Sequence, residues 1–176
     1  MNSFYKSIGL YDSLNLSLEM DGSEFTESLR KITYKTNTTF LSLIPDNGIP
    51  TRFEYRGIVN SDYFIIKKRV CFFDFNVIHS VIKGNILKEN NRTAITVEFV
   101  PFLPYLPTLV FFVPAMIFIA LQFFKENENF ILTAFPFILL IIQYFGLKRA
   151  IKKDKYDFER ELYFIARKNN QFQNIK

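Results

Sequence analysis

The chain has 176 residues, of which 49% are hydrophobic and 18% aromatic, and a formal net charge of +5. This length allows one compact domain together with two membrane spans. The charge excess lies near the C-terminus, because residues 1–99 carry 12 basic and 11 acidic residues, whereas residues 130–176 carry 9 and 4. A nucleic-acid-binding domain usually spreads its basic residues over a folded face, so this distribution argues against a nucleic-acid partner.

Histidine and cysteine are too scarce for the common metal sites. Cys71 and His79 are the only residues of their types, which excludes an internal disulfide and a zinc site built from Cys and His. The sequence also contains no G-x-S-x-G turn and no glycine-rich phosphate loop. We therefore expect a protein without metal, cofactor or catalytic residues.

The first predicted elements are a strand and a short helix. Residues 14–20 alternate strictly, with leucines and a methionine on one face, which predicts a half-buried strand. Asp21 can cap the following helix, with Glu24 as the partner in a capping box. Apolar residues then recur at helical spacing, which predicts a helix near residues 23–33.

Five further segments are typical of strands. They cover residues 39–44, 51–59, 63–72, 77–87 and 92–99, and turn-forming residues separate most of them. Gly84 inside the fourth segment indicates a bulge. The order of strand, helix and antiparallel meander predicts an α+β domain over residues 1–100.

Two long uncharged runs follow this domain. Residues 99–124 contain no charge over 26 positions, and residues 129–147 contain none over 19. Helices at about 106–124 and 130–147 would each be about 27–28 Å long, which matches the hydrocarbon core of a bilayer. The sequence therefore predicts an α+β membrane protein with a two-helix transmembrane hairpin over residues 101–147.

The polar residues around this hairpin set its expected contacts. We expect a hydrogen bond from Gln122 to Thr133 between the two helices, and a contact of Gln143 with a second copy or another protein. Five basic residues follow the second run and are interpreted as an anchor on anionic lipid headgroups: Lys148, Arg149, Lys152, Lys153 and Lys155. By the positive-inside rule, both termini would be cytoplasmic in a multi-pass protein of the cell inner membrane.

The C-terminal segment, residues 148–176, begins with this basic flank. Phe158, Leu162 and Ile165 then recur at helical spacing among charged residues. This pattern predicts that the second span continues as an amphipathic cytosolic helix to about residue 168, and its apolar stripe should pack on the first domain.

Two resemblances rest on the order of these segments. The pieces at 14–20, 25–32, 53–99 and 158–165 resemble the helix-grip arrangement of lipid-binding domains in element order. The run Phe53-x-Tyr55-x-Gly57, the segment 81–86 and the segment 93–99 before a two-span hairpin resemble small bacterial two-pass membrane proteins of uncharacterised activity. The second resemblance implies a location and no activity.

Three functions remain open on the sequence. The first is a membrane-anchored cytosolic domain that binds or scaffolds a protein partner, or a second copy, without catalysis. The second is a lipid or apolar-ligand binder with a cavity between the sheet and the C-terminal helix. The third, an enzyme acting on lipid headgroups, would need carboxylates to gather from Asp62, Asp74, Glu89 and Glu98.

Overall fold

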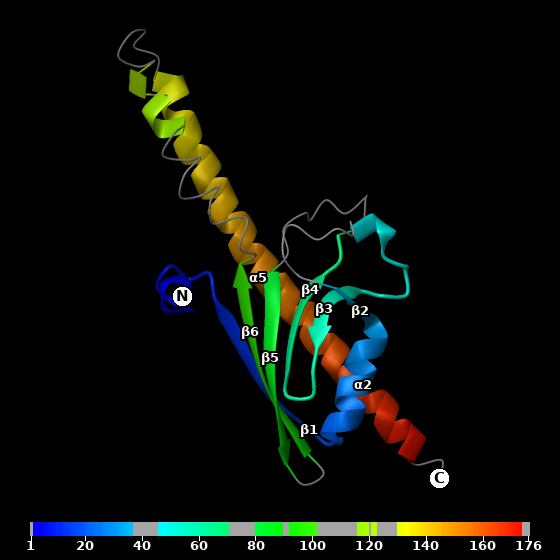
Figure 1. Cartoon of the computed structure of the whole chain (residues 1–176). Helices are drawn as coiled ribbons and strands as arrows, with labels where there is room; N and C mark the ends of the chain where they lie inside the picture. Colours follow the sequence, from blue (N-terminus) through cyan, green and yellow to red (C-terminus); the bar gives the residue numbers. More distant parts are fainter. Residues whose placement is uncertain are drawn as a thin grey trace.

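The computed structural model describes residues 2–36, 46–70, 80–89, 92–101, 116–119, 121–122 and 130–173. In chain order the elements are α1 (Asn2–Ser7), β1 (Asp12–Leu18), α2 (Gly22–Ile32), β2 (Thr33–Lys35), the 3-10 turn η1 (Asp46–Gly48), β3 (Tyr55–Val59), β4 (Tyr63–Lys68), β5 (Ser80–Glu89), β6 (Arg92–Pro101) and α5 (Phe130–Gln173). The fold is α+β, with a six-stranded sheet (Figure 1).

The sheet has the strand order β1-β6-β5-β4-β3-β2. Strands β3 to β6 form the predicted antiparallel meander, and its last strand, β6, pairs with β1, which forms one edge of the sheet. The other edge is β2, which runs parallel to β3 over only three residue pairs. The predicted strand at 39–44 lies outside the described residues.

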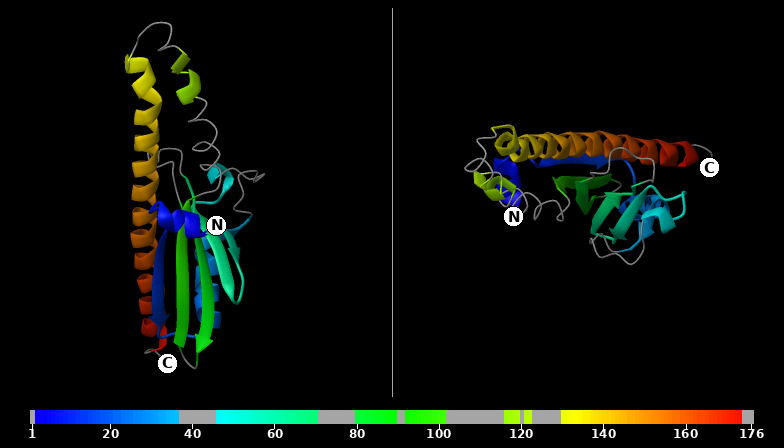
Figure 2. Two further views of the ribbon diagram at one scale, coloured as in Figure 1. Left: turned by 90° about the vertical axis from the view of Figure 1, so that its left-hand side faces the viewer. Right: turned by 90° about the horizontal axis from the view of Figure 1, so that it is seen from above.

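One face of the sheet carries the core. Alternation along each strand places Phe64, Ile82 and Phe99 on this face, and all three are buried. Helix α5 packs across β1, β6 and β5 on this face, and α2 packs beside it (Figures 1 and 2). Phe64 contacts both helices, with ring centroids 6.3 Å from Phe25 of α2 and 5.8 Å from Phe158 of α5.

Helix α2 begins where the sequence predicts. The Asp21 carboxylate accepts a hydrogen bond from the Ser23 backbone N–H at 2.9 Å, which satisfies one of the free N–H groups of the first turn. The hydrogen bonds from Ser23 are the main reason that the pKa of the Asp21 carboxyl is lower than usual. Thr33 ends the helix in an extended conformation and begins β2 directly.

Two glycines of the sheet are required by their surroundings. Gly57 has a φ of +150°, and a Cβ there would lie 2.1 Å from the Ile65 carbonyl oxygen. Gly84 lies under the Phe64 ring, and a Cβ there would lie 2.1 Å from Phe64 Cζ. The bulge predicted at Gly84 is wrong, because β5 pairs without interruption through this residue. The glycine instead makes room for the aromatic ring.

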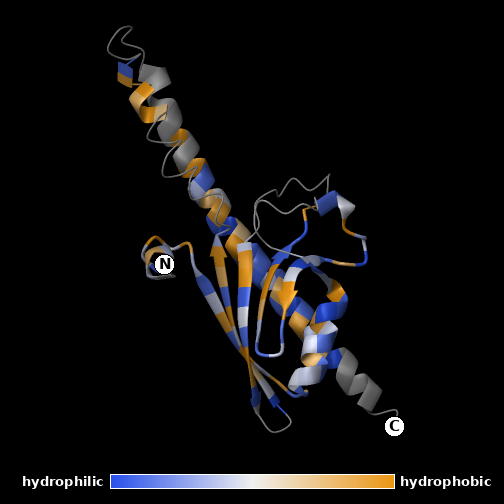
Figure 3. Ribbon diagram, in the orientation of Figure 1, coloured by the Kyte–Doolittle hydropathy of each residue, from blue (hydrophilic) through white to orange (hydrophobic). Residues whose placement is uncertain are grey.

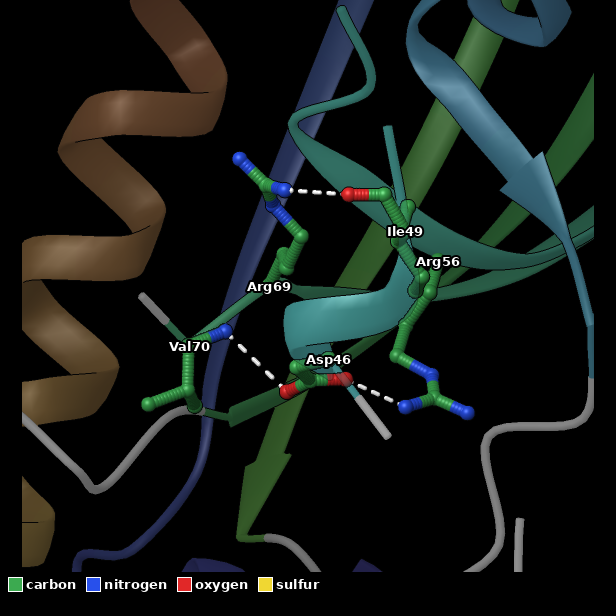
Figure 4. Close-up of polar contacts among 5 residues, drawn as sticks. All are labelled: Asp46, Ile49, Arg56, Arg69 and Val70. Carbon is green, nitrogen blue, oxygen red and sulfur yellow. Dashed lines mark hydrogen bonds and ion pairs between the residues drawn. The ribbon is translucent and has the colours of Figure 1, made fainter. Parts of the chain in front are cut away.

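An ion pair fastens η1 to the sheet (Figure 4). The Asp46 carboxylate pairs with Arg56 of β3 and accepts a hydrogen bond from the Val70 N–H at 3.1 Å. Arg69 donates to the Ile49 carbonyl oxygen at 2.7 Å. These contacts hold the 46–49 turn against the ends of β3 and β4.

The predicted membrane class is wrong. Within the described residues, no helix is long and apolar enough to cross a membrane. This finding overturns the α+β membrane fold with its transmembrane hairpin, the two-pass topology, and the multi-pass location in the inner membrane with both termini in the cytoplasm. Most of the expected first span, 106–124, lies outside the described residues, as do the side chains of 130–137 in the second.

The error has a physical reason that α5 makes visible. The uncharged run 130–147 was interpreted as a membrane span because its length matches a bilayer, and the helix was expected to continue to about residue 168. In the structure this run is the first part of one 44-residue helix that continues through the charged residues. Leu147 and Ile151 are buried in the core, so the end of the apolar run packs on the protein itself.

Candidate functional site

Helix α5 has an inner face that belongs to the core. Its buried apolar residues are three, four or seven positions apart, which places them on one side of the helix: Leu147, Ile151, Phe158, Leu162 and Ile165. Phe158 is fully buried, and its ring contacts those of Tyr55, Phe64 and Phe99 with centroids 5.8, 5.8 and 6.2 Å away. These rings occupy the space between the sheet and α5 in which the sequence analysis placed a ligand cavity.

Polar contacts fix the same face of α5 to three strands. Asp154 is buried and accepts hydrogen bonds from the Ser80 N–H at 2.5 Å and the Ser80 hydroxyl at 2.8 Å. The Lys155 ammonium lies 2.7 Å from an Asp12 carboxylate oxygen of β1. Asp157 accepts from Lys68 of β4 at 2.6 Å. Rotation of α5 about its axis would break all of these contacts, so its outer face is fixed as well.

The N-terminal segment secures α5 above the sheet. The Tyr144 hydroxyl donates to the Ile8 carbonyl oxygen at 2.9 Å, and Tyr5 and Leu10 are buried in the core cluster. Lys148 lies with its ammonium 5.9 Å from the Tyr144 ring centroid. The six-residue α1 was not predicted, because it has no capping residue and no long apolar period.

The outer face of α5 carries an apolar stripe beyond the sheet. Ile138, Ile141, Ile142 and Phe145 are 52, 53, 62 and 61% exposed. Their spacing of i, i+3, i+4 and i+7 places all four on one side of the helix. Figure 3 shows hydrophobic residues along this extended part of α5. We name these four residues the α5 stripe.

More apolar surface lies close to the α5 stripe. The short helical pieces 116–119 and 121–122 lie beside the N-terminal part of α5 (Figures 1 and 2). Their exposed large side chains are Phe118, Ile119 and Leu121. Single exposed apolar residues are common on protein surfaces, whereas several large ones on one side of a helix are typical of an interaction surface.

The predicted basic cluster divides between two roles. Lys155 pairs with Asp12, and Lys148 lies against Tyr144, so both belong to the packing of α5 on the domain. Arg149, Lys152 and Lys153 are exposed and lie on the outer side, one to two turns after the α5 stripe. We name these three residues the basic patch. The lipid-anchor role given to the cluster stays a prediction.

The predicted interhelical residues are only partly described. Gln122 is exposed and Gln143 is half-buried, while the Thr133 side chain lies outside the described residues. The hydrogen bond from Gln122 to Thr133 therefore stays a prediction. Gln143 lies between the inner face of α5 and the α5 stripe.

The structure describes the side chains of two of the four carboxylates considered for catalysis, Asp62 and Glu98. Glu98 accepts a hydrogen bond from the Tyr11 hydroxyl at 2.9 Å, and Asp62 lies in the exposed turn between β3 and β4. Asp74, Cys71 and His79 lie outside the described residues. In the part of the chain that the structure describes, no three His, Cys, Asp or Glu side chains gather as metal ligands do.

Besides Asp21, the charged groups of Glu161 and Lys67 have shifted pKa values. Burial raises the pKa of Glu161 on α5, and the charge of Glu54 adds to this shift. Burial lowers the pKa of Lys67 on β4. Neither group belongs to the α5 stripe or to the basic patch.

Comparisons of the chain with models of protein families, with curated proteins and with solved structures find no match. The site therefore rests on its geometry. The signal for the α5 stripe was present in the sequence as apolar residues at 138, 141, 142 and 145, but sequence reasoning assigned the whole run to a membrane span. Only the packing of the inner face shows which of the apolar residues stay exposed.

Proposed function

We propose that this chain is a non-catalytic binding module that holds a partner protein on the outer face of α5. The observation that carries this proposal is the α5 stripe, four large apolar side chains exposed by more than half at helical spacing on a helix whose opposite face is fixed to the sheet. An apolar stripe of this kind is the surface that a helical partner buries in helix-in-groove and coiled-coil recognition.

The chemistry of the surface specifies the partner. The α5 stripe and the basic patch together cover residues 138–153, which is about 22 Å at the rise of an α-helix. A partner helix of roughly four turns would match this length. It should carry an apolar stripe opposite residues 138–145 and acidic side chains opposite the basic patch, because opposite charges at the rim fix orientation and exclude wrong partners.

A second copy of this chain fits the surface less well. Parallel pairing of two outer faces would place the basic patches of both chains opposite each other, and like charges at an interface are unfavourable. Antiparallel pairing centred on Ile141 and Ile142 would bury the two stripes but leave both basic patches without counter-charges. Charge complementarity therefore favours an acidic partner helix.

A peptide titration with charge reversal tests this proposal. Two synthetic helical peptides share an apolar stripe and differ in the residues that follow it, which are glutamates in one and lysines in the other. The full chain should bind the acidic peptide more tightly. Replacing Arg149, Lys152 and Lys153 by glutamate should reverse this preference, because the sign of the basic patch is then inverted.

A matched pair of apolar variants separates this surface from non-specific adhesion. Ile142→Glu places a charge in the α5 stripe, and Leu87→Glu places one on the open face of β5, at exposed fractions of 62 and 61%. Ile142→Glu should weaken acidic-peptide binding by roughly tenfold or more, which corresponds to about 1.4 kcal/mol, and Leu87→Glu should not. Equal weakening of peptide binding by the two variants would contradict the proposal. So would a homodimer of the native chain that Ile142→Glu disrupts and Leu87→Glu does not.

A further inference from the structure

A pocket lies at the β2 edge of the sheet, on the side of the molecule formed by α2, β2 and β3. Its volume is about 370 Å³, and it is lined by Arg30 of α2, Thr33 and Lys35 of β2 and residues 57–60 of β3 and the following turn. The pocket forms because β2 pairs only with residues 55–57, while β3 continues to Val59. This volume lies at the lower end of the range of small-molecule sites.

The charged side chains of this pocket are both cationic. Arg30 and Lys35 line it, and no carboxylate is among the lining residues. The Arg30 Nε donates to the Val59 carbonyl oxygen at 3.2 Å, which orients the guanidinium group. That hydrogen bond is the only one that the Arg30 side chain makes to another described residue, so its terminal amino groups remain available for an anion. Planar guanidinium donors suit phosphate oxygens.

The backbone adds a further donor on the same side. The Gly57 carbonyl oxygen accepts from the Thr36 N–H at 3.1 Å and therefore faces the β2 side of the strand. Val59 lies two residues further along β3, so its N–H and C=O face this side too. The Arg30 guanidinium bonds to that carbonyl oxygen, which brings the Val59 N–H and the guanidinium to one end of the pocket.

A buried hydroxyl at the pocket wall has unused bonding capacity. Thr33 is 5% exposed, and its Oγ1 has no hydrogen-bond partner among the described residues. Buried hydroxyl groups normally find a partner, and an unpartnered one calls for an explanation. Together with Arg30, Lys35 and Asn60, it gives the pocket a surplus of hydrogen-bond donors and positive charge.

We propose that this pocket binds the phosphate group of a small phosphate monoester. Two cations and convergent N–H and O–H donors match a phosphate dianion better than a neutral ligand, since charge-assisted hydrogen bonds are the stronger ones. The volume exceeds the needs of the phosphate group alone, and Ile58 and Val59 among the lining residues offer apolar surface for the organic part. This site is separate from the outer face of α5, so it does not depend on the proposed function.

Nuclear magnetic resonance titration of the full chain tests the site with defined probes. Inorganic phosphate and glycerol 3-phosphate are added separately, and the backbone amide signals of Val59 and Asn60 are followed. We expect saturable shifts with both probes and tighter binding of glycerol 3-phosphate. Equal affinity for the two probes would contradict a site for a monoester, and shifts that do not saturate at millimolar concentration would contradict an anion site.

Variants that remove one positive charge from the pocket complete this test. Arg30→Gln and Lys35→Gln should each weaken glycerol 3-phosphate binding by roughly tenfold. Lys31→Gln is the matched control, because Lys31 lies on the same helix, pairs with Glu27 at 3.2 Å and does not line the pocket. Equal weakening in Lys31→Gln would show a general charge effect and overturn the proposal. Retained amide spectra outside the pocket would show that the variants fold.

Discussion

The Asp154 carboxylate of α5 accepts two hydrogen bonds from Ser80 of β5, one from the backbone N–H and one from the hydroxyl. Both residues are buried, so this contact is a fixed point between the helix and the sheet. It lies on the side of α5 opposite the α5 stripe. The orientation of the binding surface therefore depends on contacts that lie on the other side of the helix.

Removing the Asp154 carboxylate should loosen this fixed point. In Asp154→Ala, the Ser80 N–H and hydroxyl lose a buried acceptor, which should lower the free energy of unfolding by roughly 1–3 kcal/mol. Urea denaturation measures the change. Lys153→Ala, at the neighbouring exposed position, is the control and should stay within about 0.5 kcal/mol of the native chain. A loss of equal size in both variants would contradict the role given to Asp154.

The Phe158 ring should be the most sensitive point of the core. Phe158→Ala removes the ring that contacts Tyr55, Phe64 and Phe99, and leaves a cavity between α5 and the sheet. The expected loss of unfolding free energy is about 3–5 kcal/mol. Tyr163→Ala removes an exposed ring from the same helix and should change stability little. Near-native stability of Phe158→Ala in thermal unfolding would show that α5 does not pack as described.

A side chain at Gly84 should collide with Phe64. In Gly84→Ala the added Cβ would meet the ring, and the forced shift should destabilise the sheet by roughly 1–3 kcal/mol. Asn85→Ala, at the next and exposed position, is the control. Phe64→Leu should partly offset Gly84→Ala in the double variant, so a double-mutant cycle in denaturant should give a non-additive result. Strict additivity would contradict the close approach.

Glu161 should make stability fall as pH rises. Burial raises the pKa of Glu161 in the folded chain, so the folded state binds the proton more tightly than the unfolded state. The contribution of Glu161 to the free energy of unfolding is then fully present below the ordinary glutamate pKa of about 4.3 and is lost as pH rises through the raised value. Glu161→Gln should flatten this decline and be relatively more stable at neutral pH. Parallel stability curves of the two proteins between pH 4 and 8 would refute the shift.

Local patterns were enough to predict most of the described elements. The Asp21 cap and the helix after it are confirmed, and strands appear close to residues 14–20, 51–59, 63–72, 77–87 and 92–99. These elements follow from alternation, helical spacing and turn residues, which act over a few positions. The short connections from β3 to β4 and from β5 to β6 account for the antiparallel pairing within these two hairpins.

Features that depend on distant contacts were missed. Strand β2 has three residues and pairs in parallel with β3, so no alternation could reveal it. Gly84 was interpreted as a bulge because the sequence does not show that Phe64 lies opposite it on β4. The apolar run at 130–147 suggested a membrane span because sequence alone could not show that Leu147 packs in the core.

The two proposed sites differ in how far sequence could have shown them. The spacing of the α5 stripe is visible in the sequence, but its exposure depends on which side of α5 meets the sheet. The pocket between α2, β2 and β3 joins residues 30–35 to residues 57–60. Neither segment carries a recognisable phosphate motif, so only the fold brings Arg30, Lys35 and Val59 together.

Site-specific photocrosslinking in cells tests the central claim most directly. A photoreactive amino acid is placed in turn at positions 138, 141, 142 and 145, and at 96 on the open face of β6 as the control. We predict crosslinks to one discrete partner protein from the four stripe positions and none from 96, with the crosslinked partner residues on an apolar helix that has acidic neighbours. Crosslinks only to a second copy of this chain, or equal crosslinking from position 96, would contradict the account.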